Sequence, residues 1–475
     1  MKTALKRVAA LFFAMMLPIC CFMSYGVSAD NSQAQEGRMN LDVVFALDAS
    51  GSMLKSDPER IALDAFSLFV DMCDDSCRVG YDVYTHMLKA SENLTDVGEN
   101  EDLDIIRKRF ENITYEATGD TDIALGLTEA MRIFERSDDN DFRRKAIVLL
   151  SDGNTDLPKG PRTVAESAAE MSDTLQKLHE RHIEVYSVGL NVDGSLDKKD
   201  LENISGKTDG KVYEIDGSEK LTNTISDIFA NISDMNGVDR VIKDGKIELE
   251  VSDDSVLYAN VVVRTKLTPE AMSPVLISPN GSPVSLSANE KVKVTHTKSY
   301  MLIKIYYPEP GTWTLMLENA NGSNCNVKQM NYYAVFVEET VPERAAINTA
   351  VNVEAKIKDS NGIISDSDLL STIKMTGTVS GNNGNITFEL TRTGNGTYKG
   401  SFVPKEVGDY DVVVKAESDR FGKESIRSKL EVLTTLDEVD TVEQIFTFLR
   451  ENIMAVLIGA AVLVVLVIII VLVKK

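Results

Sequence analysis

The sequence predicts a doubly wound parallel α/β domain of Rossmann-like topology, followed by two β-sandwich domains and one C-terminal transmembrane helix. Three observations support this fold class. Short apolar runs alternate with helical patterns over residues 38–236, which is typical of a parallel sheet covered on both faces. Period-two runs punctuated by turn residues fill residues 237–433. A long uncharged apolar run occupies residues 453–473.

The composition is that of a folded, acidic protein. The 475 residues include 73 Asp and Glu against 50 Lys and Arg, a formal net charge of −23. Hydrophobic residues make up 43% of the chain, which is enough for several cores and excludes a globally disordered protein. The acidic balance argues against a nucleic-acid partner, because it repels a phosphate backbone. Five cysteines are too few for a disulfide scaffold.

The N-terminus has the pattern of a secretory signal peptide over residues 1–29. Three basic residues precede an apolar run over residues 8–21, and Val27-Ser28-Ala29 favours cleavage after Ala29. A lipoprotein signal is the weaker alternative, since the bulky Ile19 stands where a small residue should precede Cys20.

The C-terminus predicts a membrane anchor. Residues 453–473 are 21 uncharged residues, almost all Val, Leu, Ile and Ala, and as a helix they span about 30 Å, one bilayer core. Lys474 and Lys475 follow, which fits the positive-inside rule and argues against a lipid-anchor signal. Residues 434–452 are acidic and then amphipathic, as in a short stalk. We therefore expect a single-pass protein of the cell membrane whose N-terminal ectodomain is extracellular.

The α/β region contains five strand-like runs separated by helical patterns. We expect strands at residues 41–47, 78–84, 146–150, 183–190 and 211–215. We expect helices at residues 58–72, 101–110, 122–134, 162–179, 198–204 and 220–232. Because strand and helix patterns alternate, the strands should lie parallel in one sheet, with helices on both faces.

The remainder of the ectodomain reads as two β units of about 90 residues each, the size of a small sandwich. Residues 237–340 form the first, with Pro-Asn-Gly and Glu-Pro-Gly turns and the single tryptophan, Trp313, which we expect in the core. Residues 341–433 repeat this texture and predict an Ig-like sandwich.

Oxygen-bearing side chains follow two of the expected buried strands at the point where each ends. Asp48, Ser50 and Ser52 come directly after the first strand, Asp152 follows the strand at 146–150, and Thr121 lies in a loop that opens a helix. Open parallel sheets bind ligands at this carboxyl edge, and hydroxyls with carboxylates suit a hard cation such as Mg²⁺. The alternative is that these side chains only cap the following helices.

The set Asp48-x-Ser50-x-Ser52, Thr121 and Asp152 resembles the metal-ion-dependent adhesion site of von Willebrand factor type A (VWA) domains. The resemblance covers roughly residues 40–235, through the segments DVVFALDASGSM, GDTDIALGLTEA, AIVLLSDGNTD and IEVYSVGL, and suggests a VWA domain at residues 38–236.

This resemblance implies a role for each residue of the set. Ser50 and Ser52 would bind the cation directly, Asp48 and Asp152 directly or through water, and Thr121 directly in one of two states. The cation would be Mg²⁺, or else Mn²⁺ or Ca²⁺. Its open coordination position would accept an exposed Asp or Glu of a protein partner.

The function expected from such a site is binding without catalysis. We expect a cell-surface binding protein that captures a partner's carboxylate through the cation, with the β domains as spacers. The alternative is an accessory or regulatory subunit that docks a neighbouring membrane or surface complex through the same site. A hydrolase is disfavoured, because His179 and His182 are three apart rather than four, and the four His form no recognisable triad.

Cys73 and Cys77 lie between the first expected helix and the next strand. Outside the cell such a pair can close a small loop, so we expect a disulfide, with two free thiols as the alternative. Cys325 has no partner in the mature chain and should be buried.

Overall fold

The computed structural model describes residues 38–434, with gaps at residues 99, 138–142, 154, 159–160, 193, 195, 197, 288, 360 and 382–383. The predicted signal peptide at 1–29, the predicted transmembrane helix at 453–473 and all but the first residue of the predicted stalk at 434–452 lie outside this range. Within the range, no helix is long and apolar enough to cross a membrane.

Contacts divide the chain into two compact units. Unit 1 comprises the chain up to Phe336, together with Ile357–Ile373 and Glu417–Glu424. Unit 2 comprises Val337–Lys356, Lys374–Ala416 and the chain from Ser425 onward.

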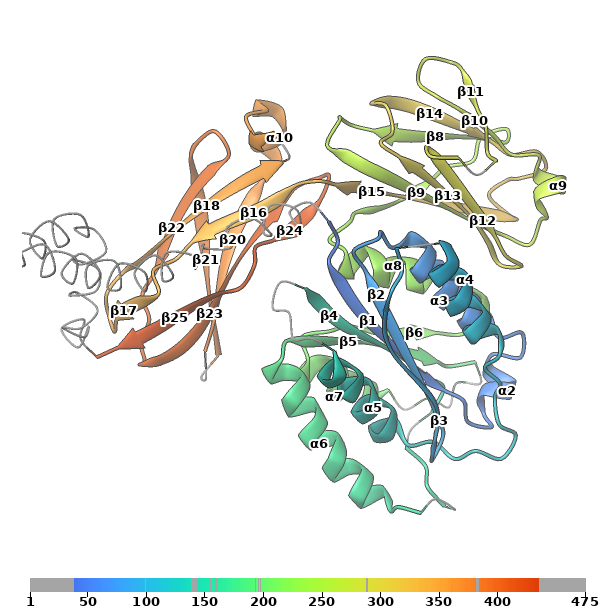
Figure 1. The fold of residues 1–475 in the computed structure, drawn as a ribbon, viewed down its shortest axis with the longest axis horizontal. Coiled ribbons are helices and arrows are strands. Elements are labelled where there is room, and N and C mark those ends of the chain that lie inside the picture. The colour runs from blue at the N-terminus through green and yellow to red at the C-terminus, as the bar shows by residue number, and fades with distance from the viewer. Residues whose placement is uncertain are drawn as a thin grey trace, which may run out of the picture. The chain divides into compact units, whose positions relative to one another are not determined.

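A six-stranded sheet forms the centre of the first part of unit 1 (Figure 1). Its order is β3-β2-β1-β4-β5-β6. The strands are β1 (Leu41–Asp48), β2 (Arg78–Tyr84), β3 (Leu88–Asp96), β4 (Arg144–Ser151), β5 (Ile183–Leu190) and β6 (Val212–Ile215). Neighbouring strands are parallel except β3, which runs antiparallel to β2. The predicted parallel sheet is confirmed, and β3 adds an edge strand that the sequence pattern does not indicate.

Helices cover both faces of this sheet (Figure 1). One face carries α3 (Ile61–Met72), α4 (Asn100–Glu111) and α8 (Leu221–Ile232), and the other carries α5 (Ile123–Arg136), α6 (Val164–Glu180) and α7 (Lys199–Lys207). The short α2 (Met53–Ser56) and the 3-10 turn η1 (Ser218–Lys220) complete the set. Phe45 of β1 stacks on Phe66 of α3, whereas Val44 packs in the core on the opposite face. Burial on both faces explains the continuous apolar run of β1.

Two further sheets follow in unit 1. A five-stranded sheet has the order β12-β13-β9-β15-β7, and a four-stranded sheet has the order β11-β10-β14-β8. The elements are β7 (Gly237–Arg240), β8 (Lys246–Val251), β9 (Val256–Thr265), α9 (Pro269–Met272), β10 (Val275–Ile277), β11 (Pro283–Val284), β12 (Val292–His296), β13 (Tyr300–Tyr306), β14 (Gly311–Met316) and β15 (Cys325–Tyr333). Trp313 is buried, as expected, and its indole N–H donates to the carbonyl of Glu309 over 2.9 Å.

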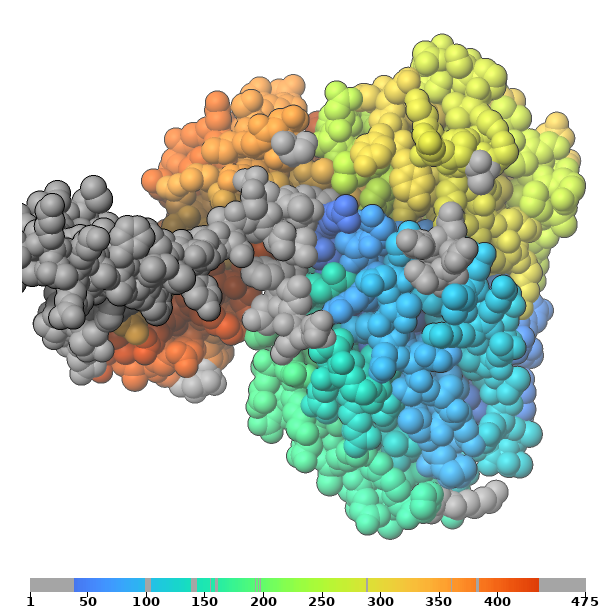
Figure 2. Space-filling view, in the orientation of Figure 1, coloured from blue at the N-terminus to red at the C-terminus, as the bar shows by residue number. Residues whose placement is uncertain are grey.

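The five-stranded sheet packs directly on helices of the α/β region. Strand β8 alternates buried and exposed residues, but β9 and β13 are buried along nearly their whole length. Tyr258 and Leu302 of this sheet belong to the same hydrophobic core as α3 and α8. The surfaces of the two regions, blue and yellow in Figure 2, adjoin accordingly. The α/β region and the first β region therefore share one core.

Unit 2 is built around a sheet with the order β16-β18-β22-β21-β20-β23-β25-β17. From Phe336 onward the elements are β16 (Phe336–Thr340), β17 (Arg344–Ala346), β18 (Val351–Asp359), β19 (Gly362–Ile363), α10 (Ser367–Thr372), β20 (Lys374–Gly381), β21 (Gly384–Gly394), β22 (Thr397–Phe402), β23 (Gly408–Glu417), β24 (Gly422–Glu424) and β25 (Ser428–Leu433). Of these, β19, α10 and β24 belong to unit 1. The predicted succession of many β strands after the α/β domain is confirmed.

The expected disulfide between Cys73 and Cys77 is not formed. Both cysteines are buried free thiols, as is Cys325. The Cys77 thiol lies 3.7 Å from the Met39 sulfur and 3.5 Å from Asp74 Oδ1. Spacing alone indicated a pair that could close a loop, but it did not reveal that Cys77 faces the protein core.

Candidate metal centre

Asp48 lies at the carboxyl end of β1 and is fully buried. Its Oδ1 accepts the backbone N–H of Ser50 over 2.8 Å, and its Oδ2 accepts the hydroxyl of Ser151 over 2.7 Å. Burial raises the pKa of Asp48 to about 6, although these hydrogen bonds oppose the rise. Among the residues that the structure describes, no basic side chain forms an ion pair with Asp48. An ionised Asp48 therefore lacks a compensating positive charge from the described chain.

A chain of hydroxyls connects the first loop to Asp152, which follows β4. The Ser50 and Ser52 hydroxyl oxygens are 3.0 Å apart, and Ser52 donates to Asp152 Oδ1 over 2.7 Å. Ser56 donates to Asp152 Oδ2 over 2.5 Å. The structure thus brings Ser50, Ser52 and Asp152 together, and Asp48 touches the same loop through Ser50.

Thr121 is held beside this group by backbone contacts. The N–H of Gly51 donates to the carbonyl of Gly119 over 3.1 Å, which joins the first loop to the loop that carries Thr121. Thr121 and Asp156 exchange two backbone hydrogen bonds, of 3.1 and 2.9 Å. The loops that carry the five predicted residues are therefore tied together at the carboxyl edge of the sheet.

The start of α5 fixes the position of Thr121. Asp122 caps this helix, and its Oδ1 accepts the Leu125 N–H over 3.3 Å. Gly126 lies against the ring of Tyr84, and a Cβ at this glycine would come within 2.3 Å of that ring. Glycine is therefore required for α5 to approach β2 this closely.

Two residues of this site are not in the sequence-predicted set. Ser151 is the last residue of β4 and orients Asp48, while Ser56 ends α2 and orients Asp152. Ser56 lies four residues after Ser52, which is about one turn of a helix, so both hydroxyls reach the same carboxylate. The sequence could indicate this only if the short helix α2 were recognised first.

The donor set fits a hard cation. Two carboxylates and three hydroxyls are the ligand types that Mg²⁺ and Mn²⁺ accept. Among the described residues, no group of three or more His, Cys, Asp or Glu side chains is placed to hold a metal ion, so soft or purely acidic sites are not indicated there. The buried Asp48 carboxylate, which the described chain leaves without a basic partner, is what a bound cation would neutralise.

Residues 42–227 match the family model of the von Willebrand factor type A domain. No curated protein matches this chain.

Several solved structures are similar to parts of the chain, and this chain covers less than two thirds of each of the following three. A von Willebrand factor type A protein from Catenulispora acidiphila is 16% identical, with a TM-score of 0.36, over 68% of this chain and 63% of that one. Proximal thread matrix protein 1 of the mussel byssus, with a zinc-occupied MIDAS motif, is 18% identical, with a TM-score of 0.33, over 42% and 49%. The PilB minor pilin of Streptococcus sanguinis is 20% identical, with a TM-score of 0.32, over 42% and 62%.

The family match spans every residue of the candidate centre and all of the sheet and its helices except Leu41 and the end of α8. This chain therefore contains a von Willebrand factor type A domain at residues 42–227.

Proposed function

We propose that this protein is a non-enzymatic binding protein of the cell surface, and that its VWA domain captures a carboxylate of a protein partner through a divalent cation. The observation that carries the proposal is the convergence of Ser50, Ser52 and Asp152 beside the buried Asp48. Asp48, Ser50, Ser52, Thr121 and Asp152 would hold the cation.

The ligand set explains why a partner's acidic side chain would be attracted. Three of the five donors are neutral hydroxyls, and the hydroxyls of Ser56 and Ser151 draw electron density from the two carboxylates through hydrogen bonds. The cation would therefore keep part of its attraction for a further anion. When bound, the cation would supply an open coordination position for an Asp or Glu. This local charge would overcome the repulsion expected from a chain with a net charge of −23.

The protein's own residues would orient the site before any ligand arrives. Ser151 holds one oxygen of Asp48 and Ser56 holds one oxygen of Asp152. Such outer hydrogen bonds fix the direction of ligating carboxylates, and their loss commonly weakens metal binding tenfold or more, roughly.

Mn²⁺ titration of the full chain in detergent micelles tests the metal site. We expect one saturable site in the wild type, and binding weakened at least about 100-fold in Asp48→Ala. Asp173→Ala, an exposed carboxylate on α6, is the matched control and should bind Mn²⁺ normally. Equal binding by Asp48→Ala and the wild type would contradict the assignment.

Capture from native membranes tests the role. The wild type should retain a partner in Mg²⁺ and release it in EDTA, and Asp48→Ala should retain none. A stoichiometric partner from the same membrane would favour the accessory-subunit alternative, whereas a matrix or foreign-surface protein would favour adhesion. Retention that is unaffected by EDTA would refute a metal-mediated function while leaving the metal site itself intact.

A further inference from the structure

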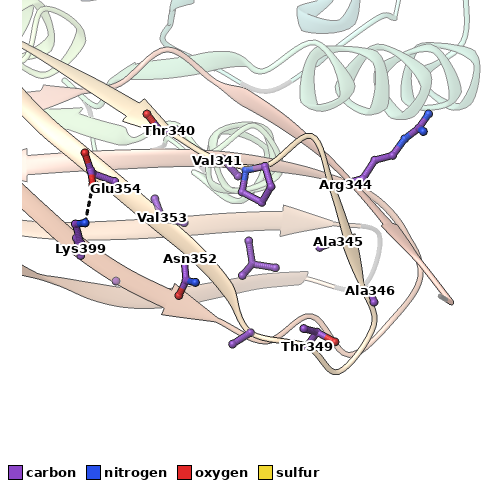
Figure 3. A pocket seen from close by; sticks show the side chains of 14 residues that line it. Thr340, Val341, Arg344, Ala345, Ala346, Thr349, Asn352, Val353, Glu354 and Lys399 are labelled. Carbon is purple, nitrogen blue, oxygen red and sulfur yellow. Dashed lines mark ion pairs between the residues drawn. The ribbon is translucent and has the colours of Figure 1, made fainter. Parts of the chain in front are cut away.

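Unit 2 carries an open groove of about 680 Å³ (Figure 3). Its floor is formed by the buried side chains of Ala345, Val351 and Val353, and Val341 and Pro342 line its side. The lining is thus mainly apolar along the strands β17 and β18. An apolar groove of this kind fits a short segment that carries small or branched aliphatic side chains.

The rim of the groove carries two cationic side chains. Arg344 pairs with Glu431 over 2.8 Å, and Lys399 pairs with Glu354 over 2.9 Å, as drawn in Figure 3 for the second pair. Arg344 and Lys399 are both more than two fifths exposed at their side chains, so each still faces solvent. An apolar segment would complement the floor of this groove, and carboxylates on it would share Arg344 and Lys399 with Glu431 and Glu354.

The chain leaves the described range beside this groove. The last strand, β25, runs parallel to β17, and Leu433 is the register partner of Ala346. The N–H of Ile347 donates to the carbonyl of Leu433 over 2.8 Å. The residues that follow Leu433 therefore start next to the wall of the groove, and three extended residues reach about 10 Å.

The sequence after this exit has the complementary pattern. Leu436, Val439 and Val442 recur every third residue, followed by Ile445 and Phe446. Four acidic residues are interspersed among them, namely Asp437, Glu438, Asp440 and Glu443. The segment thus offers aliphatic side chains for the floor, and carboxylates that can share Arg344 and Lys399 with Glu431 and Glu354.

We propose that residues 436–446 of the same chain dock in the groove of unit 2. The tether of two or three residues gives this segment an effective concentration in the millimolar range or above, so a modest intrinsic affinity suffices. Docking leaves only residues 447–452 as a free spacer before the apolar segment at 453–473. Unit 2 would then be held close to the predicted anchor instead of on a long stalk.

Disulfide trapping in the full chain tests the docking. In membranes, Ala346→Cys combined with Val439→Cys should form an intrachain disulfide under a mild oxidant, identified by non-reduced peptide mapping. Asn395→Cys combined with Val439→Cys is the matched control, because the turn before β22 lies at the other end of β18 from the groove. We expect the first pair to form at least about tenfold faster.

A third variant separates docking from mere proximity of the tether. Adding Val442→Asp to the Ala346→Cys and Val439→Cys pair removes an apolar contact without shortening the tether, so docking predicts about tenfold slower trapping. Unchanged trapping would show random collision and overturn the proposal. Disulfides that form only between two copies of the chain would show that the groove binds a second molecule. Equal rates of disulfide formation at residues 346 and 395 would show that residues 436–446 do not dock in the groove.

Discussion

The hydroxyl of Tyr300 on β13 donates to Asp71 Oδ2 on α3 over 2.8 Å. Beside it, Lys304 and Asn260 each donate to the carbonyl of Met72 over 3.2 Å. These donors satisfy the end of α3, where backbone carbonyls have no partner within the helix. The first β region therefore completes a helix of the VWA domain, and the two form one body rather than a domain and a separate spacer.

Shared burial predicts that α3 and β13 unfold together. Tyr300→Phe removes one buried hydrogen bond and should lower the free energy of unfolding by about 1–2 kcal/mol. In hydrogen exchange at increasing denaturant concentration, peptides of α3 and of β13 should lose protection at the same concentration. This should hold in the wild type and in the variant. Tyr307→Phe, at an exposed side chain, is the control and should change nothing. Separate transitions for the two regions would contradict the shared core.

Because the Ser56 hydroxyl donates to Asp152, we expect it to affect metal binding without contacting the cation. Ser56→Ala leaves Asp152 Oδ2 without its donor, so Mn²⁺ affinity in the full chain should fall about tenfold while the fold is retained. Calorimetric titration measures the affinity, and circular dichroism checks the fold. Ser172→Ala, an exposed serine on α6, should bind as the wild type does. An affinity unchanged in Ser56→Ala would show that Asp152 is oriented by other contacts.

The sequence could predict the parallel sheet and the loops of the centre because these depend on local patterns. Buried strands such as β1 produce continuous apolar runs, and ligand residues follow them directly. The edge strand β3 could not be found in this way, because Leu88–Asp96 is polar and is a strand only through its pairing with β2.

Two further features have different causes, the first local and the second long-range. The helix expected at Pro58 begins instead at Ile61, because Arg60 adopts a left-handed conformation and Asp57 accepts the N–H of Ile61 over 2.8 Å. The burial of Lys304, which is 2% exposed, depends on its contact with the end of α3. The second feature has no signature in a single sequence window, because Lys304 and Met72 are far apart in the sequence.

Free, buried thiols predict slow alkylation. Burial raises the pKa of Cys77 well above its usual value and that of Cys325 to about 11, so little thiolate exists at pH 8. Iodoacetamide should label the native protein slowly at Cys73, Cys77 and Cys325, and all three quickly after denaturation without reductant. Mass spectrometry identifies the sites. Unlabelled Cys73 and Cys77 after denaturation would restore the disulfide interpretation.

The raised pKa of Asp48 predicts how stability and metal binding depend on pH. The folded protein holds a proton on Asp48 up to about pH 6, whereas the unfolded chain releases it near 3.8. Between these values the folded state binds more protons, so this group makes the metal-free protein less stable as the pH rises from about 4 to 6. Asp48→Asn cannot ionise and removes this loss, so the metal-free variant should be more stable than the wild type at pH 7.

The same substitution should abolish cation binding, because the cation requires the ionised carboxylate. In the wild type, Mg²⁺ should therefore stabilise the fold at pH 7 and lose this effect as the pH falls through about 6. Thermal unfolding of both proteins from pH 4 to 8 measures the stability of each protein at each pH. Comparing Mg²⁺ with EDTA measures how much the cation adds to that stability. The prediction fails if metal-free Asp48→Asn is less stable than the wild type at pH 7, since Asp48 would then be stabilising in its charged form and would not require a cation.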